Sequence, residues 1–188
     1  IWATNALEGP MWPQCTELDG IVDANGELQL FVKATGTFST HIDSLGYSYT
    51  NNLNYIYNIE LNESGVQNVI FVDSVMTDDV PTDGANALGG AVGWGARLRA
   101  SKTADGSAVF AVWTDTEDLE AFGGENGAPN IKAAGRMIDG DFNDFPVTNF
   151  TADDLYAGFY YFINVGQVSR IADNFVHIPV TTSVSPAE

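Results

Sequence analysis

The fold class is decided by the stretch SKTADGSAVFAVWTDT, residues 101–116. In it a polar turn ending at Asp105-Gly106 leads into an apolar run at 108–113. Asp-Gly suits the positive φ of a tight hairpin turn, and a continuous apolar run is typical of a strand covered on both faces. Similar glycine-containing turns precede apolar strands at 22–32 and 61–72. We therefore expect antiparallel hairpins to recur along the chain.

Short segments rich in Val, Ile, Phe and Tyr fill much of the remaining sequence. The stretches 55–61 and 97–100 alternate apolar and polar residues with a period of two, as half-buried strands do. Helical periodicity is almost absent, because the best helical candidate, 117–122, is shorter than two turns. The chain is therefore predicted to be all-β, with strands at 28–34, 54–61, 68–75, 96–101, 108–114, 130–137, 158–165 and 175–182.

The glycines of the three recurring turns, Gly26, Gly65 and Gly106, are spaced by 39 and 41 residues. Propeller blades recur at roughly 40–50 residues, with four strands in each. The spacing therefore favours several β-propeller blades, forming a partial or small propeller. The alternative is a β-sandwich, because every antiparallel sheet needs hairpins.

Both ends of the sequence suggest a longer precursor. The chain begins at Ile1 and ends in a polar stretch after residue 180. We expect residues 1–188 to be a single all-β region within a larger propeller-containing protein.

The charge balance limits the possible partners. There are 25 acidic residues against 7 basic ones, a formal charge of −18. Such a surface repels phosphate backbones and anionic lipids, which argues against nucleic-acid binding and membrane docking. The longest apolar runs fall well short of the roughly 18 residues of a transmembrane helix. Cys15, the one cysteine, cannot form a disulfide within the chain.

The acidic segment at 139–144 has the opening pattern of a calcium loop. Asp139, Asp141 and Asn143 place oxygen ligands at alternate positions, so that they can converge on one hard cation. The glycine and the bidentate Glu of a complete EF-hand are missing from this segment. The alternative is an Asx-rich turn between strands.

Two Gly- and Asp-rich segments, 77–95 and 115–130, are expected to form long loops, where ligands commonly bind. Trp94 is flanked by glycines and could stack on a sugar ring, although ordinary packing would use the same side chain. The expected ligand-binding residues are Trp94, Glu125 and Asn126.

Catalytic motifs are absent from the sequence, and no catalytic residue is predicted. His41 and His177 lie in no metal-ligand or triad spacing, and neither a nucleophile elbow nor a phosphate loop occurs. Paired carboxylates could serve a glycosidase. Among 25 acids some must lie near one another by chance, so solvated surface charge is the alternative. The loop carboxylates are Asp78, Asp79, Asp83, Glu117, Asp118, Glu120 and Glu125.

The segment 101–116 resembles the Asp-Gly strand–turn–strand of sialidase-like secreted β-propellers. The same segment, together with 41–47, 130–136, 147–151 and 158–162, resembles large Bacteroidota surface proteins exported by type IX secretion. This resemblance implies an extracellular location or the outer-membrane surface of a Gram-negative bacterium. For such a host it also implies O-glycosylation at Ser44 and Ser74, each of which follows an Asp and precedes an apolar residue.

The resemblance to sialidases stops at the fold. A sialidase holds its substrate carboxylate with three arginines, whereas Arg97 and Arg99 share one expected strand and Arg136 and Arg170 stand elsewhere. We therefore expect a non-enzymatic extracellular or cell-surface module that binds a protein or glycan and helps to build a surface assembly. The alternative is a carbohydrate-active hydrolase or lyase that uses loop carboxylates.

Overall fold

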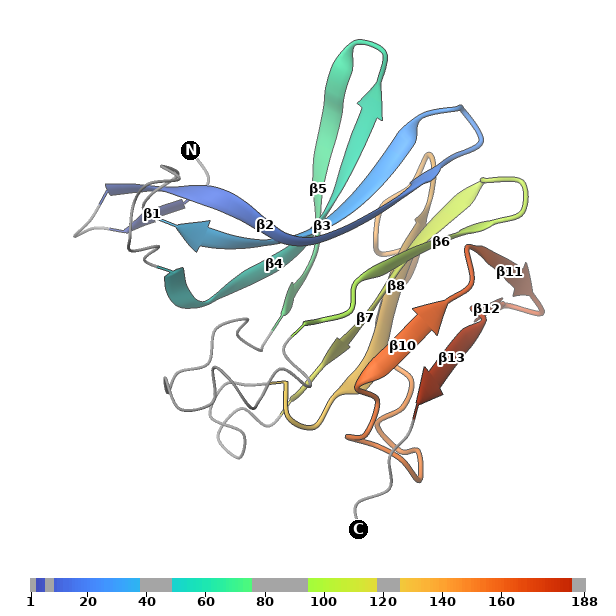
Figure 1. Ribbon diagram of the computed structural model, residues 1–188. Coiled ribbons are helices and arrows are strands. Elements are labelled where there is room, and N and C mark those ends of the chain that lie inside the picture. The colour runs from blue at the N-terminus through green and yellow to red at the C-terminus, as the bar shows by residue number, and fades with distance from the viewer. Residues whose placement is uncertain (1–2, 6–8, 38–48, 76–94, 118–125, 184–188) are drawn as a thin grey trace.

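The computed structural model describes residues 3–5, 9–37, 49–75, 95–117 and 126–183. These residues form β-strands and turns without a helix, as Figure 1 shows. Consistent with this, the described part of the chain offers no helix that could span a membrane. The strands are β1 (Ala3–Asn5), β2 (Gly9–Val22), β3 (Leu28–Thr37), β4 (Tyr49–Asn62), β5 (Gly65–Val75), β6 (Arg99–Thr103), β7 (Ala108–Asp115), β8 (Asn130–Met137), β9 (Phe145–Asn149), β10 (Phe162–Val165), β11 (Val168–Ala172), β12 (Phe175–His177) and β13 (Val180–Ser183).

The strands form two large sheets and a small one. The first sheet has the order β1-β2-β3-β4-β5, and all its neighbours are antiparallel. The second has the order β12-β11-β6-β7-β8-β9, in which β6 to β9 form an antiparallel meander and β11 runs parallel to β6. β10 and β13 form a separate antiparallel pair.

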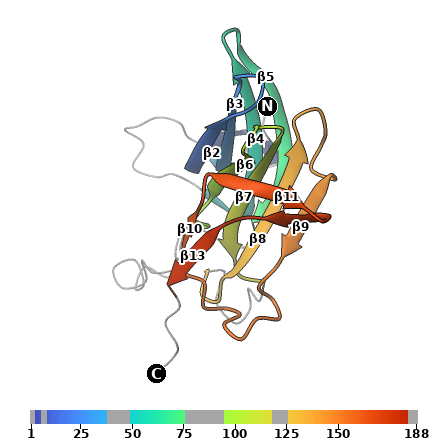
Figure 2. The same cartoon turned by 90° about the vertical axis from the view of Figure 1, so that its right-hand side faces the viewer.

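The two large sheets face each other across a shared core (Figure 1). Phe31 and Ile56 of the first sheet and Trp113 of the second are fully buried in it. On the other face of the second sheet, Val112 packs with Ile163 of β10. Figure 2 shows the separate β10–β13 pair in front of this face, next to the β11 end of the six-stranded sheet. The six-stranded sheet is therefore the middle layer of the described structure.

Two hairpin turns meet at one end of this core. The turn between β2 and β3 and the turn between β6 and β7 are joined by a hydrogen bond from Ala24 N to Gly106 O, 3.1 Å long. Gly26, Gly65 and Gly106 have φ values of 80°, 104° and 75°, so the predicted turn glycines are confirmed.

The spacing of these glycines has a different meaning from the predicted one. Gly26 lies in the turn between β2 and β3, and Gly65 is the first residue of β5, directly after the turn from β4, so both belong to the first sheet. Only Gly106 belongs to the second sheet. The interval of about 40 residues therefore does not correspond to a repeating unit of one sheet, as the blades of a propeller would require. The all-β prediction is confirmed.

In β4 the polar residues of the period-two pattern face the interior and the apolar ones between them face outward, which is the reverse of the usual arrangement. Asn58 and Glu60 point into the space between the sheets and are buried, whereas Tyr57 and Ile59 point to the outer side. The buried polar side chains are accommodated by Arg136 of β8, which lies opposite them and is also buried. The first sheet thus turns apolar side chains to both of its faces.

Candidate ligand-binding groove

A cavity of about 830 Å³ opens on the outer face of the six-stranded sheet. β12 and β9 are the two edge strands of this sheet, and residues from both line the cavity. β7 and β8 supply its floor. We call it the groove; its lining residues are Phe110, Ala133, Ala134, Asp144, Phe145, Pro146, Thr148, Phe150, Asn174, Phe175, Val176, His177, Ile178 and Pro179.

A two-residue turn places β12 over the sheet. Asp173 and Asn174 connect β11 to β12 with φ values of 53° and 63°, the conformation that a type I′ turn requires. Asp and Asn tolerate positive φ better than other non-glycine residues. This reversal brings β12 back across the outer face, where Figure 2 shows β11 and β12 in front of β7 and β8.

Aromatic side chains dominate the interior of the groove. Phe110 is buried at its floor, and its ring lies 5.5 Å from that of Phe145 at an interplanar angle of 55°. Phe175, which is 68% exposed, and Phe150, which is 47% exposed, also line it. Exposed aromatic rings of this size contribute most of the energy when they are buried by a partner.

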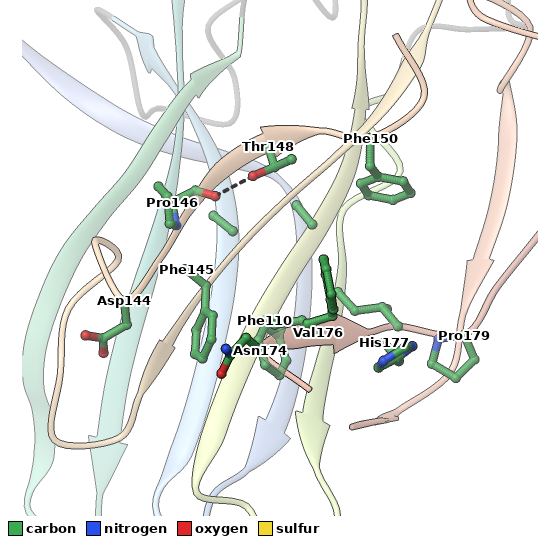
Figure 3. Close-up of a pocket in the computed structure, with 14 residues that line it drawn as sticks. Phe110, Asp144, Phe145, Pro146, Thr148, Phe150, Asn174, Val176, His177 and Pro179 are labelled. Carbon is green, nitrogen blue, oxygen red and sulfur yellow. Dashed lines mark hydrogen bonds between the residues drawn. The ribbon is translucent and has the colours of Figure 1, made fainter. Parts of the chain in front are cut away.

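A few polar groups lie among the aromatic ones, as Figure 3 shows. Pro146 and Thr148 lie on the β9 side, where the Thr148 hydroxyl donates to the Pro146 carbonyl at 3.0 Å. Asn174 and His177 lie on the β12 side and are exposed. Asp144 accepts a hydrogen bond from Met137 N at 3.0 Å through Oδ2. The groove is mainly apolar with a polar rim, which is typical of a binding site.

A second group of polar residues lies between the two large sheets. Lys132 of β8 contacts Asp115 at 3.1 Å and Glu117 at 3.7 Å, and Asp115 is completely buried. Asp73 of β5 lies nearby, and burial raises the pKa of its carboxyl despite the opposing effect of Lys132. Asn149 also donates to Glu117, at 3.0 Å. Glu117 is the one member of the predicted loop carboxylates that lies in the described residues.

The predicted ligand-binding residues fall in two classes. Trp94 and Glu125 lie outside the described residues. Asn126 is 1% exposed and holds the fold together, because its Nδ2 donates to Gly95 O at 3.2 Å and its Oδ1 accepts from Thr116 Oγ1 at 2.8 Å. It lies apart from the lining of the groove.

The predicted calcium ligands lie in the turn between β8 and β9. Asp139, Asp141 and Asn143 are exposed there, and Asp141 Oδ1 accepts from Asn143 N at 2.7 Å. That bond is characteristic of an Asx turn. Within the described ranges, no three His, Cys, Asp or Glu side chains gather into a group that could hold a metal ion.

Only one of the two predicted glycosylation sites lies in the described residues. Ser74 is exposed on β5, whereas Ser44 lies outside the described residues.

The groove itself was not found by sequence reasoning. Its walls come from strands that are distant in sequence, so no local motif announces it. The one available signal is the Asp173-Asn174 pair between two short apolar segments, which favours a type I′ hairpin. Comparisons with protein-family models, with curated proteins and with solved structures found no match for this chain.

Proposed function

We propose that this chain is a non-enzymatic binding and assembly module at the cell surface, and that the groove binds an apolar segment of a partner protein. The observation that carries the proposal is the exposure of Phe150 and Phe175 beside the buried ring of Phe110. Burying exposed aromatic area is favourable by roughly 25 cal/mol per Å². A glycan needs many directed hydrogen bonds, and the groove offers few polar side chains, so its chemistry favours a protein segment over a sugar.

The proposed location is extracellular or on the outer membrane of a Gram-negative bacterium. It is supported by the resemblance to proteins exported by type IX secretion and by the formal charge of −18, which disfavours nucleic acid and anionic lipid. The proposal includes O-glycosylation at Ser74 and Ser44, of which Ser74 is accessible on β5.

The finer fold proposal is that the two large sheets are neighbouring propeller blades. It is supported by two four-stranded meanders, β2 to β5 and β6 to β9, that follow each other in the chain and pack face to face on a shared core. Their first strands lie side by side: Glu17 and Asp19 of β2 accept hydrogen bonds from Leu98 N and Ala100 N at 2.8 and 3.0 Å. Blades of a propeller also pack face to face around their first strands.

The test is binding of the 188-residue chain to a peptide array rich in Phe, Leu and Val and to a glycan array, each with and without calcium. We expect binding to apolar peptides, lost in Phe175→Ser and retained in Leu155→Ser. Leu155 is the matched control because it is 87% exposed and lies outside the groove. Binding to glycans alone, or peptide binding that survives Phe175→Ser, would count against the proposal. A calcium requirement abolished by Asp141→Asn would assign calcium to Asp139, Asp141 and Asn143.

A second candidate function is a carbohydrate-active hydrolase or lyase. The Lys132–Asp115–Glu117 group favours it, together with the Asp73 carboxyl, whose pKa is raised by burial, because a general acid needs a carboxyl with a pKa above the ordinary value. Release of reducing ends from a glycan, abolished by Glu117→Gln or Asp73→Asn, would support this function over binding alone.

A further inference from the structure

Lys132 of β8 and Asp115 of β7 form an ion pair inside the protein. Lys132 Nζ lies 3.1 Å from Asp115 Oδ2. The Asp115 side chain is completely buried, and the Lys132 side chain is 10% exposed. The carboxyl carbon Cγ is one bond from Oδ2, so a primary amine is held next to a carbon that it can attack.

Two neighbouring strands hold this pair in place. β7 and β8 are antiparallel in the six-stranded sheet, and their register pairs Trp113 with Lys132 and Asp115 with Asn130. Trp113, Asp115 and Lys132 therefore share the face of the sheet that is turned to the core, where Trp113 is fully buried. Two reacting groups that are fixed in a near-attack geometry behave as if their concentration were about 10⁵–10⁸ M. The sheet thus supplies the orientation that amide formation between the two side chains needs.

Two further carboxyl groups can move protons to and from this pair. Glu117 Oε1 lies 3.7 Å from Lys132 Nζ, and the Glu117 side chain is 57% exposed, so it can exchange protons with water. Asp73 of β5 interacts electrostatically with both Lys132 and Asp115 from the opposite sheet, and burial raises the pKa of its carboxyl. Glu117 can therefore accept a proton from the amine, and a protonated Asp73 can donate one to a departing oxygen.

We propose that Lys132 and Asp115 become joined by an isopeptide bond, an amide between Nζ and Cγ, which forms within the folded chain. The ammonium group transfers a proton to Glu117, and Nζ then attacks Asp115 Cγ. The bond from Cγ to one carboxyl oxygen breaks, and that oxygen leaves as water. In the net reaction one ammonium and one carboxylate give a neutral amide and one water molecule, so no oxidant or reductant is needed. Glu117 and Asp73 end in the protonation states in which they began.

The burial of the pair favours the amide over the ion pair. Taking two charges out of water costs free energy, and a neutral amide carries neither charge. Burial also keeps out the water that would hydrolyse the new bond. The buried ion pair of Arg136 and Glu60 cannot react in this way, because a guanidinium group stays protonated and is not a nucleophile.

The bond would stabilise the chain as a disulfide does. It would connect two residues that are 17 positions apart and so restrict the unfolded chain. Cys15 is the one cysteine, so an internal disulfide cannot provide such a cross-link. The inference concerns the two central strands of the second meander, and it depends neither on the groove nor on the proposed function.

The test is the intact mass of the purified 188-residue chain, measured after denaturation. We expect the mass to be lower than the mass calculated from the sequence by one water molecule. Trypsin should then fail to cleave after Lys132, and the peptide 103–136 should carry the loss. Lys132→Arg keeps the positive charge without a nucleophilic amine and should have its full mass. Asp115→Asn is the second variant, which has no carboxyl group at this position and should lose no water.

A time course tests the proton relay. The mass is followed after cell-free synthesis, and circular dichroism shows whether each variant keeps its β-structure. Glu117→Gln should slow the loss of water by at least about tenfold, because a positioned acid or base contributes more than this to a rate. Asp153→Asn removes an exposed carboxyl outside the group and should leave the rate unchanged.

Three results would overturn the inference. A folded chain with its full calculated mass contains an ordinary ion pair. A loss of water that persists in Lys132→Arg arises elsewhere, such as from a cyclic imide at Asp105-Gly106. A loss at the same rate in Glu117→Gln as in the parent chain contradicts the proton relay.

Discussion

Arg136 of β8 donates from Nε to Asn58 Oδ1 of β4, 3.0 Å away, across the space between the two large sheets. The same guanidinium donates to Gln29 Oε1 at 3.0 Å and forms an ion pair with Glu60. Its remaining donors bond two backbone carbonyl oxygens at the end of β8. Gln29 continues the network to Asp23 Oδ2 at 2.7 Å. The Arg136 side chain thus bonds residues of both large sheets.

Replacing Arg136 by Met is expected to destabilise the fold by about 3–5 kcal/mol, because Glu60 would remain buried without a cation. Chemical denaturation of the purified variant measures the change. Arg170→Met is the control, since Arg170 is an exposed residue of β11 and its replacement should cost less than about 0.5 kcal/mol. Equal costs for the two variants would show that the network contributes nothing to stability.

Two turn glycines provide a matched pair for testing how the hairpins dock. Gly26 and Gly106 have similar φ values of 80° and 75°. A Cβ at Gly26 would meet nothing within 4 Å, whereas one at Gly106 would lie 2.6 Å from Ala24 N. Alanine at Gly26 should therefore cost about 1–2 kcal/mol from backbone strain alone. Alanine at Gly106 adds an overpacking cost of about 1–3 kcal/mol.

The measurement is again the free energy of unfolding, with both variants in the same denaturant. The Gly106→Ala variant should also lose the hydrogen bond from Ala24 N, which hydrogen exchange at Ala24 can follow. If both substitutions cost the same, the contact between the two turns does not exist in solution.

Local sequence was sufficient for most strands and for the turns. The run 108–113 predicts a strand buried on both faces, and every residue of β7 is buried. Gly26, Gly65 and Gly106 predict tight turns because few other residues adopt their φ values. By contrast, 158–165 was too long a prediction, because a turn precedes β10. The strand predicted at 175–182 is interrupted around Pro179, which has no N–H to donate to a ladder.

What local sequence could not provide is the choice of face. The alternation in β4 predicts that its side chains point to two different faces, but it does not say which face is buried. Asn58 and Glu60 are buried because they bond Arg136, which lies about 80 residues further along the chain. The groove has the same origin, since β9 and β12 become its walls only when the second sheet is complete. β2 was missed because Pro10 and Pro13 lie within it, and β9 because Pro146 does.

Asp105, in the turn between β6 and β7, makes stability depend on pH. Hydrogen bonds from the side chain of Thr103 and from the backbone and hydroxyl of Ser107 lower its pKa to about 2. A carboxyl whose pKa is lower in the folded state contributes stability above its unfolded pKa of about 3.9, and that stability is lost as pH falls toward 2. We expect the Asp105 carboxyl to titrate near pH 2 by NMR. Asp105→Asn should flatten the decline in stability over that window, whereas Asp153→Asn, at an exposed site, should not.

Asn126 distinguishes a structural role from a ligand-binding one. Its amide joins Gly95 O, Thr114 O and Thr116 Oγ1, the last at 2.8 Å, and the side chain is buried. Replacement by Ala should leave these buried groups unpaired and lower the free energy of unfolding by about 1–3 kcal/mol. Asn164→Ala, at an exposed position of β10, is the control and should be close to neutral. A fully stable Asn126→Ala variant with weakened ligand binding would return Asn126 to the binding site, with Trp94 and Glu125 as its expected neighbours. A destabilised variant whose remaining folded fraction binds peptide normally would assign Asn126 to the fold, because the groove would then act without it.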